Sequence, residues 1–499
     1  MNTLKLRSLS VAPAQHKSEL LLVPVFESEL DAAHVSPLFA AGAGLVAAQA
    51  QVESFVGKHA QTMLHFSAQH LAATRTLYVG MGRRDKLNAR TLRSSLTGAF
   101  KEAKRLKITD VALALPELAG CKVGTEEFGR AVGECAGTVD YVMNHQKTAR
   151  GGHKPELRLG QVSLLGGDNA ASASGLEQGY TLARAVNFAR DLVTEPAGTM
   201  TPMRLANHAQ KVAAASGGSI ACRLYFRKEL KTMGANAFLA VARGSTEQPV
   251  LIELDYNPAD ADPSVQLCLI GKSVTFDTGG YDLKPAAGMR TMKCDMGGGA
   301  ATLAAIEAIA ALKLPVRVKV LMAATENMVS GNAYKPGDVL HTMAGLTVEV
   351  DNTDAEGRLT LADAIEFARR KGVTHIVDVA TLTGAIRVAL GSAGAGAFGN
   401  TPEFTRRVID AGAAGGELYW ELPLWDELAK ANESKIADLK NSGGDAGAGS
   451  ITAALFLSRF AAGTPWVHLD IAAVAFEQEQ GTGWGVRTLV ELVRSFAKK

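Results

Sequence analysis

An alternation of strand-like and helix-like segments runs from Thr201 to the end of the chain, and it constrains the fold more than any other feature. The strand-like segments are short apolar runs at residues 267–271, 316–325, 346–351 and 375–382. The segments between them repeat apolar residues three and four positions apart, as in 359–372, where three basic residues precede a final glycine and mark a helix end. Strands that alternate with helices predict a mostly parallel sheet covered on both faces.

A smaller version of this alternation occupies residues 1 to about 150. Strand-like runs at 19–26, 74–82 and 110–115 surround a helical segment at 89–107. The basic face of that helical segment is interpreted as solvated, since its single aromatic residue, Phe100, does not supply the several aromatics that interleave the charges of a nucleic-acid surface. This region predicts a second, smaller α/β layer structure.

The stretch from Gly151 to about Gly175 is rich in glycine and polar residues, and we interpret it as a connection between domains. A segment of helical periodicity follows at 176–193. Because 499 residues exceed one ordinary hydrophobic core, we expect an α/β protein of two domains. A smaller N-terminal α/β domain with its connection spans 1–174, and a linking helix leads into a larger C-terminal α/β domain, 175–499, with a mostly parallel central sheet.

The composition excludes several classes of protein. The formal net charge of +2 gives no strong attraction to nucleic acid or to a membrane surface. The five cysteines are scattered and form no CxxC, which suits a reducing compartment and argues against a thiolate zinc site. The first residues lack the apolar core of a signal peptide, and no apolar run reaches the roughly 18–20 residues of a membrane span. We therefore expect a cytoplasmic protein with no membrane partner.

Polar residues follow each predicted strand of the C-terminal region. In parallel α/β sheets, ligands bind beyond the carboxyl ends of the strands. A single loop carboxylate usually caps a helix or faces water, but several at one edge, together with lysines and an arginine, indicate a site. The residues at this edge are Lys272, Asp277, Glu326, Asn327, Asn352, Asp354, Glu356, Arg358, Thr381 and Thr383.

Several familiar catalytic motifs are absent. Gly271-Lys272-Ser273 is no phosphate-binding loop, because Gln266 stands where that motif needs a glycine. The sequence contains no HExxH, and no serine has glycine at both −2 and +2. The GxGxxG match at 394–399 follows no clean strand and is interpreted as a small-residue loop or tight packing. The 11 histidines do not cluster near the polar edge, so a metal there would be held mainly by oxygen.

Three motifs in this region carry a resemblance. The block "NTDAEGRL" at 352–359, the pattern GK-x4-D-TGG-x3-KP at 271–285 and "MK-x-DM" at 292–296 together resemble the paired signature of the leucyl aminopeptidase family. The similarity extends from "NFARDLVTEPAG" at 187–198 to "GWGVRTL" at 483–489. The N-terminal region is similar to the family in layout alone. The resemblance implies a metal-dependent aminopeptidase that removes N-terminal residues from short peptides with a free N-terminus.

The resemblance also implies two divalent ions, held by one lysine and four carboxylates: Lys272, Asp277, Asp295, Asp354 and Glu356. Asp277 and Glu356 would bridge the ions, and Lys284 and Arg358 would be catalytic residues outside the ligand set. The four carboxylates balance the four positive charges of two such ions. Asp354 and Glu356 are two residues apart, so on an extended segment both side chains face the same way. Mn²⁺ or Zn²⁺ is expected, with Mg²⁺ or Co²⁺ as substitutes, and a bicarbonate anion at Arg358 would act as general base.

The family pattern carries over in part to the substrate pocket, through Met292, Asn352, Ala355, Thr381, Leu382 and Gly384. Such an apolar, mid-sized pocket favours leucine- or methionine-like residues. The family assembles as hexamers with enclosed active sites, so we expect a homohexamer acting on short peptides. The chain departs from the usual pattern at Ser273, where glycine is common, and at Tyr281-Asp282, where a smaller and less charged pair is common.

Two alternative functions remain open at this stage. The same two-metal site would suit a phosphoester substrate, although the pocket argues against one, and turnover of an aminoacyl anilide discriminates between them. A DNA-binding role, non-catalytic or additional, is the alternative from a different class, since some members of the family have one. The net charge of +2 gives it no support, and a gel shift across salt concentrations tests it because phosphate contacts weaken steeply with salt.

Overall fold

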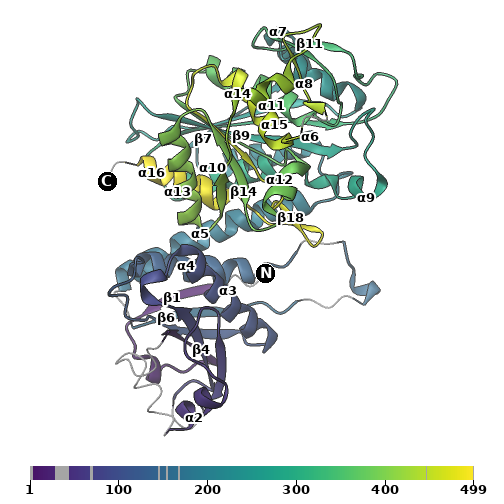
Figure 1. Cartoon of the computed structure of the whole chain (residues 1–499). Helices are drawn as coiled ribbons and strands as arrows, with labels where there is room; N and C mark the ends of the chain where they lie inside the picture. Colours follow the sequence, from purple (N-terminus) through teal and green to yellow (C-terminus); the bar gives the residue numbers. More distant parts are fainter. Residues whose placement is uncertain are drawn as a thin grey trace. The chain divides into compact units, whose positions relative to one another are not determined.

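The computed structural model describes residues 4–27, 44–67, 71–143, 146–152, 156–166, 169–444 and 447–497. The chain packs as two units, Met1–Val142 with Gln146–Arg184, and Ala185–Lys499 with Met143–His145. The division falls inside the long helix α5 (Asn169–Thr194), as does the domain boundary predicted at residue 174 (Figure 1). Of the helices in these described ranges, none has the length and apolar character needed to cross a membrane.

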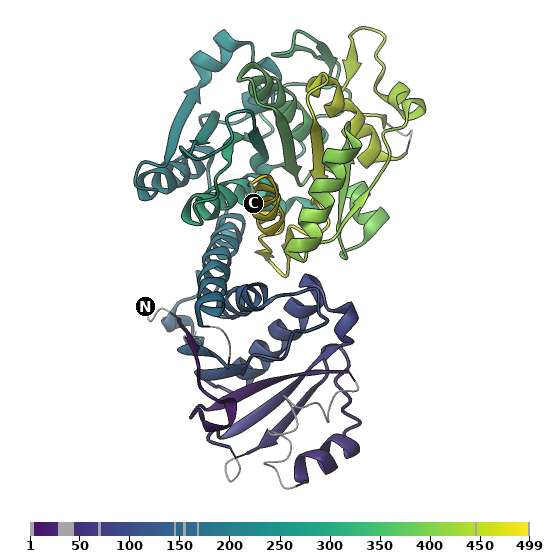
Figure 2. The ribbon, with the colours of Figure 1, turned by 90° about the vertical axis from the view of Figure 1, so that its left-hand side faces the viewer.

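The first unit is built on a six-stranded sheet in the order β1-β6-β5-β2-β4-β3. All neighbouring strands are parallel except β3 and β4. Helices α3 (Ala89–Arg105) and α4 (Thr125–Val139) pack on one face, and α2 (Leu45–Val52) packs on the other (Figure 2). The strands are β1 (Lys5–Leu9), β2 (Leu20–Phe26), β3 (Thr62–Phe66), β4 (Arg75–Gly82), β5 (Asp110–Ala114) and β6 (Gln161–Leu165). The predicted smaller α/β domain is confirmed.

The glycine-rich stretch 151–175 is not an irregular connection along its described residues. Strand β6 lies within it, between β1 and β5, and helix α5 begins at Asn169. Glycine has a packing role here: a Cβ on Gly175 would lie 2.2 Å from the carbonyl oxygen of Glu126 on α4. A Cβ on Gly133 of α4 would lie 2.3 Å from the carbonyl oxygen of Leu176. The glycines that suggested a loop therefore allow helices α4 and α5 to approach closely. Residues 153–155 and 167–168 lie outside the described ranges.

The second unit is built on an eight-stranded sheet in the order β15-β14-β17-β13-β9-β10-β8-β7. The four central strands are parallel, and the sheet ends in antiparallel pairs at β7–β8 and β8–β10. The mostly parallel central sheet predicted from the alternation is therefore confirmed. The strands are β7 (Ile220–Phe226), β8 (Val250–Tyr256), β9 (Gln266–Asp277), β10 (Arg317–Asn327), β13 (His375–Ala380), β14 (Ala395–Gly399), β15 (Tyr419–Glu421) and β17 (Trp466–Asp470). The GxGxxG match at 394–399, interpreted as a small-residue loop or tight packing, is no loop, because strand β14 begins at Ala395. It is tightly packed, since a Cβ on Gly396 would lie 2.5 Å from Cδ1 of Ile386.

Helices cover both faces of this sheet. Cys268 and Ile270 of β9 pack in one core with α8 (Asn236–Val241), α11 (Gly357–Arg370) and α15 (Gly449–Ala461). On the opposite face α10 (Gly297–Ala311) packs against β9 and α16 (Val486–Phe496). A Cβ on Gly271 would lie 2.5 Å from the Cα of Gly299, so glycine on both elements lets α10 begin against the sheet. This close approach places the segment just before α10 beside the end of β9.

The run at 346–351 does not join the central sheet as predicted. It forms β12 (Thr347–Glu349), which pairs with β11 (Val339–His341) and β16 (Leu439–Lys440) in a separate three-stranded sheet. Val348 is buried while Thr347 and Glu349 are partly exposed. Such alternation is typical of a strand with one solvated face, whereas a central parallel strand is apolar on both faces. The segment after β12 still reaches the central sheet, because it leads into α11.

Candidate metal centre

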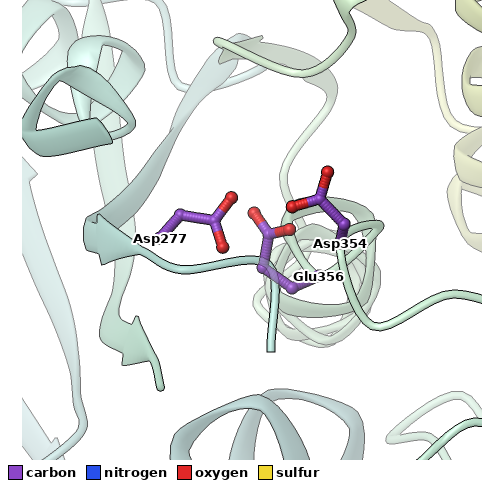
Figure 3. Close-up of side chains that lie close together, drawn as sticks. All are labelled: Asp277, Asp354 and Glu356. Atoms are coloured by element: carbon purple, nitrogen blue, oxygen red, sulfur yellow. The ribbon is translucent and has the colours of Figure 1, made fainter. Parts of the chain in front are cut away.

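The candidate site lies where β9 and β10 end and α11 begins. Asp277 closes β9 and Asn327 closes β10, and the two are partners in the parallel register. The side-chain amide of Asn327, through Nδ2, donates a hydrogen bond of 2.9 Å to Oδ1 of Asp277. Asp354 and Glu356 come from the loop that enters α11, and all three carboxylates point toward one another (Figure 3). One oxygen from each lies within 4.8 Å of the others, so the sequence-predicted carboxylates meet in space.

The loop from Asp354 to Glu356 is not extended, so the predicted reason for their convergence is wrong. Glu356 has helical dihedrals, φ −75° and ψ −36°, and is the N-cap of α11. The Asp354 amide donates to Oδ1 of Asn352 at 2.6 Å, a side-chain turn of the kind that Asn favours. A turn into a helix, and not a pleated segment, brings both carboxylates onto one side.

Two residues of the predicted edge bond to other segments: Thr383, whose hydroxyl donates to Oδ2 of Asp470 at 2.6 Å, and Glu326. Glu326 lies near the end of β10. Its Oε2 accepts a hydrogen bond of 2.5 Å from Ser245. A register shift between Thr325 and Glu326 interrupts the pairing of β10 with β9 at this point. The bulge turns Asn327 toward Asp277 and leaves Glu326 bound to a different segment. Proximity to a strand end in sequence is therefore not enough to place a side chain at the site.

Lys272 and Asp295 complete the group of charged residues. The Lys272 ammonium lies 2.8 Å from Oδ1 of Asp295 and 2.9 Å from Oε1 of Glu356. It also donates to the carbonyl oxygen of Thr381 at 3.0 Å. A Cβ on Gly357 would lie 2.5 Å from Cε of Lys272, so glycine after Glu356 is what allows the lysine to pass the helix start. The glycine of the eight-residue block, Gly357, is therefore required for steric reasons.

Lys284 and Arg358, the predicted catalytic residues, have different surroundings. The Lys284 ammonium lies 2.9 Å from Oδ2 of Asp277 and 2.5 Å from Oδ1 of Asp354, with its side chain partly exposed. Arg358 is buried, and its Nη1 donates to the carbonyl oxygen of Asn441 at 2.6 Å. Its Nε is buried without a hydrogen-bond partner among the described residues. Lys284 therefore faces the carboxylates directly, whereas Arg358 retains a donor for a further acceptor.

The electrostatics show how crowded the negative charge is. Burial and the charge of Glu356 raise the pKa of Asp277 to about 6, and burial raises the pKa of Asp295 well above its ordinary value. Burial alone would lower the pKa of Lys272, but the charges of Asp295 and Glu356 outweigh it and raise that pKa. Burial lowers the pKa of Arg358 to about 10. Burial first, and repulsion between the carboxylates second, favour the protonated forms of Asp277 and Asp295, so additional cations would stabilise the ionised forms.

The donor set fits divalent ions. Four carboxylates supply hard oxygen ligands of the kind that Mn²⁺ and Mg²⁺ accept, and the lysine supplies nitrogen once it is neutral. Oδ2 of Asp295 is buried and accepts no hydrogen bond from the part of the chain that the structure describes. An unsatisfied buried carboxylate oxygen costs free energy, and a cation would satisfy it. The residues present therefore fit a metal centre.

The residues predicted to line the pocket lie in different local environments. Thr381 lies at the end of β13, and its hydroxyl donates to Oδ1 of Asp295 at 2.8 Å. Leu382 donates its amide to Asp470 at 3.2 Å. Met292 is partly buried in the short helix η5 (Met292–Cys294), just before Asp295. Gly384 begins helix α12 (Gly384–Leu390) at an exposed position, where a Cβ would have no described atom within 4 Å.

Asn352 and Ala355 are held through their backbone by Asn441. The side-chain amide of Asn441, through Nδ2, donates to the carbonyl oxygens of Asn352 at 2.7 Å and of Ala355 at 3.2 Å. Its side-chain oxygen accepts the amide of Asp351 at 2.8 Å. Asn441 lies within the region of the family resemblance, 187–489, yet no motif or spacing in the sequence indicates this role. It fixes the loop that carries Asp354 and Glu356.

Known proteins are similar to this chain over most of its length. Residues 187–490 match the model of the cytosol aminopeptidase family, catalytic domain, and residues 22–150 match that family's N-terminal domain. A probable cytosol aminopeptidase of Solibacter usitatus is 42% identical over 487 residues, which cover 96% of each chain. One of Gloeobacter violaceus is 37% identical over 504 residues, covering 98% of this chain and 99% of that protein.

Solved structures with the same fold are also known. A mutant of tomato leucine aminopeptidase matches with a TM-score of 0.89 and 31% identity, covering 98% of this chain and 96% of that chain. The bottromycin maturation enzyme BotP in complex with Mn matches with a TM-score of 0.83 and 33% identity, covering 96% and 100%. The similarity therefore extends over both units of the chain.

Proposed function

Because this chain belongs to the cytosol aminopeptidase family and is an aminopeptidase, we propose that it removes leucine- or methionine-like N-terminal residues from short peptides with the help of two divalent ions. The observation that carries this proposal is the convergence of Asp277, Asp354 and Glu356 within 4.8 Å, beside the buried Lys272–Asp295 pair. Two lysines pair with these four carboxylates, so the group keeps an excess of negative charge that further cations would neutralise.

The proposed ligands are the five residues that the motifs indicate: Lys272, Asp277, Asp295, Asp354 and Glu356. Bound there, two divalent ions supply Lewis-acid activation of a water and of the scissile carbonyl. Lys272 would be neutral in that state, since an ammonium has no lone pair to offer. Mn²⁺ or Zn²⁺ is the proposed occupant, with Mg²⁺ or Co²⁺ accepted, and the Mn complex of BotP supports a metal of this class.

Lys284 and Arg358 are proposed to act on the substrate and on an anion. Lys284 is partly exposed and lies at the carboxylates that would hold the ions, so its ammonium can stabilise the oxyanion of the tetrahedral intermediate. Arg358 keeps Nε free of described partners, and a planar guanidinium suits a small planar anion such as bicarbonate. That anion would take the proton of the attacking water. Met292, Asn352, Ala355, Thr381, Leu382 and Gly384 are proposed to line the substrate pocket.

The free N-terminus of the substrate gives the sharpest test of this function. A neutral amine offers a lone pair to a cation, whereas an amide is a poor ligand and a bulkier group. The ordinary α-amino pKa is about 7.7–8.0, so the neutral fraction grows at mildly alkaline pH. We expect kcat/KM for a leucine anilide to rise from pH 7 toward about 9, and its N-acetyl twin to be essentially inert. Comparable cleavage of the two compounds would indicate an endopeptidase- or esterase-like site instead.

We also propose a cytoplasmic homohexamer. The curated relatives are described as cytosol aminopeptidases, which supports the location. Large apolar side chains stand exposed on the second unit, among them Trp420 at 69% and Trp425 at 60%. Exposed aromatic residues of this size are typical of protein–protein contacts. Light scattering that returns six times the mass of one chain would support the assembly, and the mass of a single chain would remove it.

A further inference from the structure

Asp282 and Thr353 form a reciprocal clamp between two segments of the site. The Thr353 amide and hydroxyl both donate to Oδ2 of Asp282, at 2.7 and 2.9 Å. In return the Asp282 amide donates to the Thr353 hydroxyl oxygen at 2.8 Å. Asp282 itself lies at the surface, while Thr353 is fully buried. These three hydrogen bonds join the loop after β9 to the loop before α11.

Thr353 is held on its other side as well. Its carbonyl oxygen accepts hydrogen bonds from Asn327 at 3.0 Å and from the Tyr334 hydroxyl at 2.7 Å. The Thr353 hydroxyl oxygen also lies 2.7 Å from the carbonyl oxygen of Gly279, so its one hydrogen is shared between that carbonyl and Oδ2 of Asp282. Every backbone and side-chain polar group of Thr353 is therefore hydrogen-bonded. The Asn327 side chain also donates to Asp277, so it links Thr353 to Asp277. Removal of the Asp282 side chain leaves the carbonyl contacts intact but frees the amide.

The clamp acts on the two residues that meet in the site. Asp354 follows Thr353 directly, and Lys284 lies two residues beyond Asp282. Their side chains form the 2.5 Å ion pair at the open side of the carboxylate group. The space between the segments is tight, because a Cβ on Gly279 would lie 2.4 Å from the Asp282 carbonyl oxygen and 2.8 Å from Oδ1 of Asp354. A small shift of either segment therefore changes the relation of Lys284 to Asp354.

We propose that Asp282 is a positioning residue, whose clamp on Thr353 sets the places of Asp354 and Lys284. This inference rests on the proposed function, because it assigns Asp354 to a metal ion and Lys284 to the substrate. Neighbours that orient a metal ligand change metal affinity or activity by about 10–100-fold when removed, and a misplacement of about 1 Å in an active site costs about 100-fold in rate. The side-chain oxygen of Asp282 thus has a use in the site, as the acceptor of the Thr353 amide and hydroxyl.

The test compares three variants by Mn²⁺ titration, kinetics and amide hydrogen exchange. Asp282→Ala removes the acceptor, and we expect about tenfold weaker binding of Mn²⁺ and about tenfold lower kcat at saturating Mn²⁺. KM is expected to stay within about twofold, and the Thr353 amide to exchange faster. Asp282→Asn keeps a side-chain oxygen for the same two donors and is expected to recover most of both losses. Because Asp282 is exposed, thermal unfolding is expected to change little.

Glu19→Ala is the matched control. Oε2 of Glu19 accepts the Thr109 amide at 2.8 Å and the Thr109 hydroxyl at 3.2 Å. This is a similar clamp between a carboxylate and a threonine in the first unit, and its loss is expected to leave Mn²⁺ affinity and kcat unchanged. The proposal is overturned if Asp282→Ala binds Mn²⁺ and turns over substrate like the parent protein. It is also overturned if Asp282→Asn is as impaired as Asp282→Ala while its Thr353 amide exchanges normally.

The proposed function and the proposed role of the Asp282–Thr353 clamp are contradicted by different measurements. A parent protein that binds Mn²⁺ but leaves a leucine anilide intact would contradict the proposed function. The comparison of Mn²⁺ affinity and Thr353 exchange between the parent and Asp282→Ala would still decide whether the clamp positions Asp354. Faster exchange at Thr353 without any loss of Mn²⁺ affinity would assign the clamp to local stability alone and overturn the proposal.

Discussion

Replacing Glu356 with glutamine is expected to lower kcat/KM for a leucine anilide by at least about a thousandfold, roughly 4 kcal/mol of transition-state stabilisation. Glu356 is buried, contacts Lys272 at 2.9 Å and shares one small volume with Asp277 and Asp354. Glutamine has nearly the same shape but no charge, so the proposed bridging position between two cations is lost. Metal content measured on the purified variant is expected to fall with the activity.

A control for this substitution lies on the same helix. Glu366 of α11 does not belong to the site and forms ion pairs with Arg369 and Arg370 at 2.5 and 3.0 Å. Glu366→Gln removes a charge of the same kind and is expected to leave metal content and kcat/KM unchanged. Asp354→Asn is expected to behave like Glu356→Gln, with the protein still folded by circular dichroism. Turnover by Glu356→Gln at the parent rate would remove Glu356 from the reaction.

Replacing Lys284 with alanine is expected to lower kcat by about 100- to 1,000-fold, the range seen when one oxyanion donor is removed, while the metal content stays near that of the parent protein. The physical reason is that Lys284 competes with cations for Asp277 and Asp354. Its removal leaves those carboxylates with more negative charge to offer a metal. Arg358→Ala is expected to show the same separation, since the contact of Arg358 is with the Asn441 carbonyl.

The measurement for these two variants is kcat beside elemental analysis of the same samples. A loss of metal from Lys284→Ala would mean that Lys284 holds an ion and that the assignment of Lys272 as the ligand must be revised. A kcat within about threefold of the parent value in either variant would limit that residue to balancing charge. These two contradicting outcomes can be told apart. A ligand role for Lys284 would lower the metal content, whereas a charge-balancing role would leave both the metal content and kcat near the parent values.

The central strands of the fold were predictable because parallel strands buried on both faces are continuous apolar runs. β9, β10 and β13 lie where those runs stand in the sequence. Two segments were misjudged where glycine has a packing role. Residues near Gly175 suggest a loop, yet they form the close face of α5. Residues 394–399 suggest a loop or tight packing, and they form the tightly packed strand β14. Composition alone does not distinguish a turn glycine from one that meets a neighbouring backbone.

The site was predictable as far as its motifs reach. The ligand residues proposed from the motifs meet one another, because strand ends and a helix start bring them to one edge. Their support was not predictable. Asn441 lies about 90 positions from the loop that it holds, and the Asp282–Thr353 clamp joins segments 71 positions apart. Such pairs depend on tertiary contacts for which a single sequence carries no periodic or spacing signal.

The most direct test of the central claim is a titration of chelator-treated, metal-free protein with Mn²⁺, followed by counting of bound ions and turnover of a leucine anilide in the same samples. The account predicts no turnover without metal, and activity that reaches its plateau when two ions are bound per chain. Full turnover of the protein with no detectable metal would contradict it.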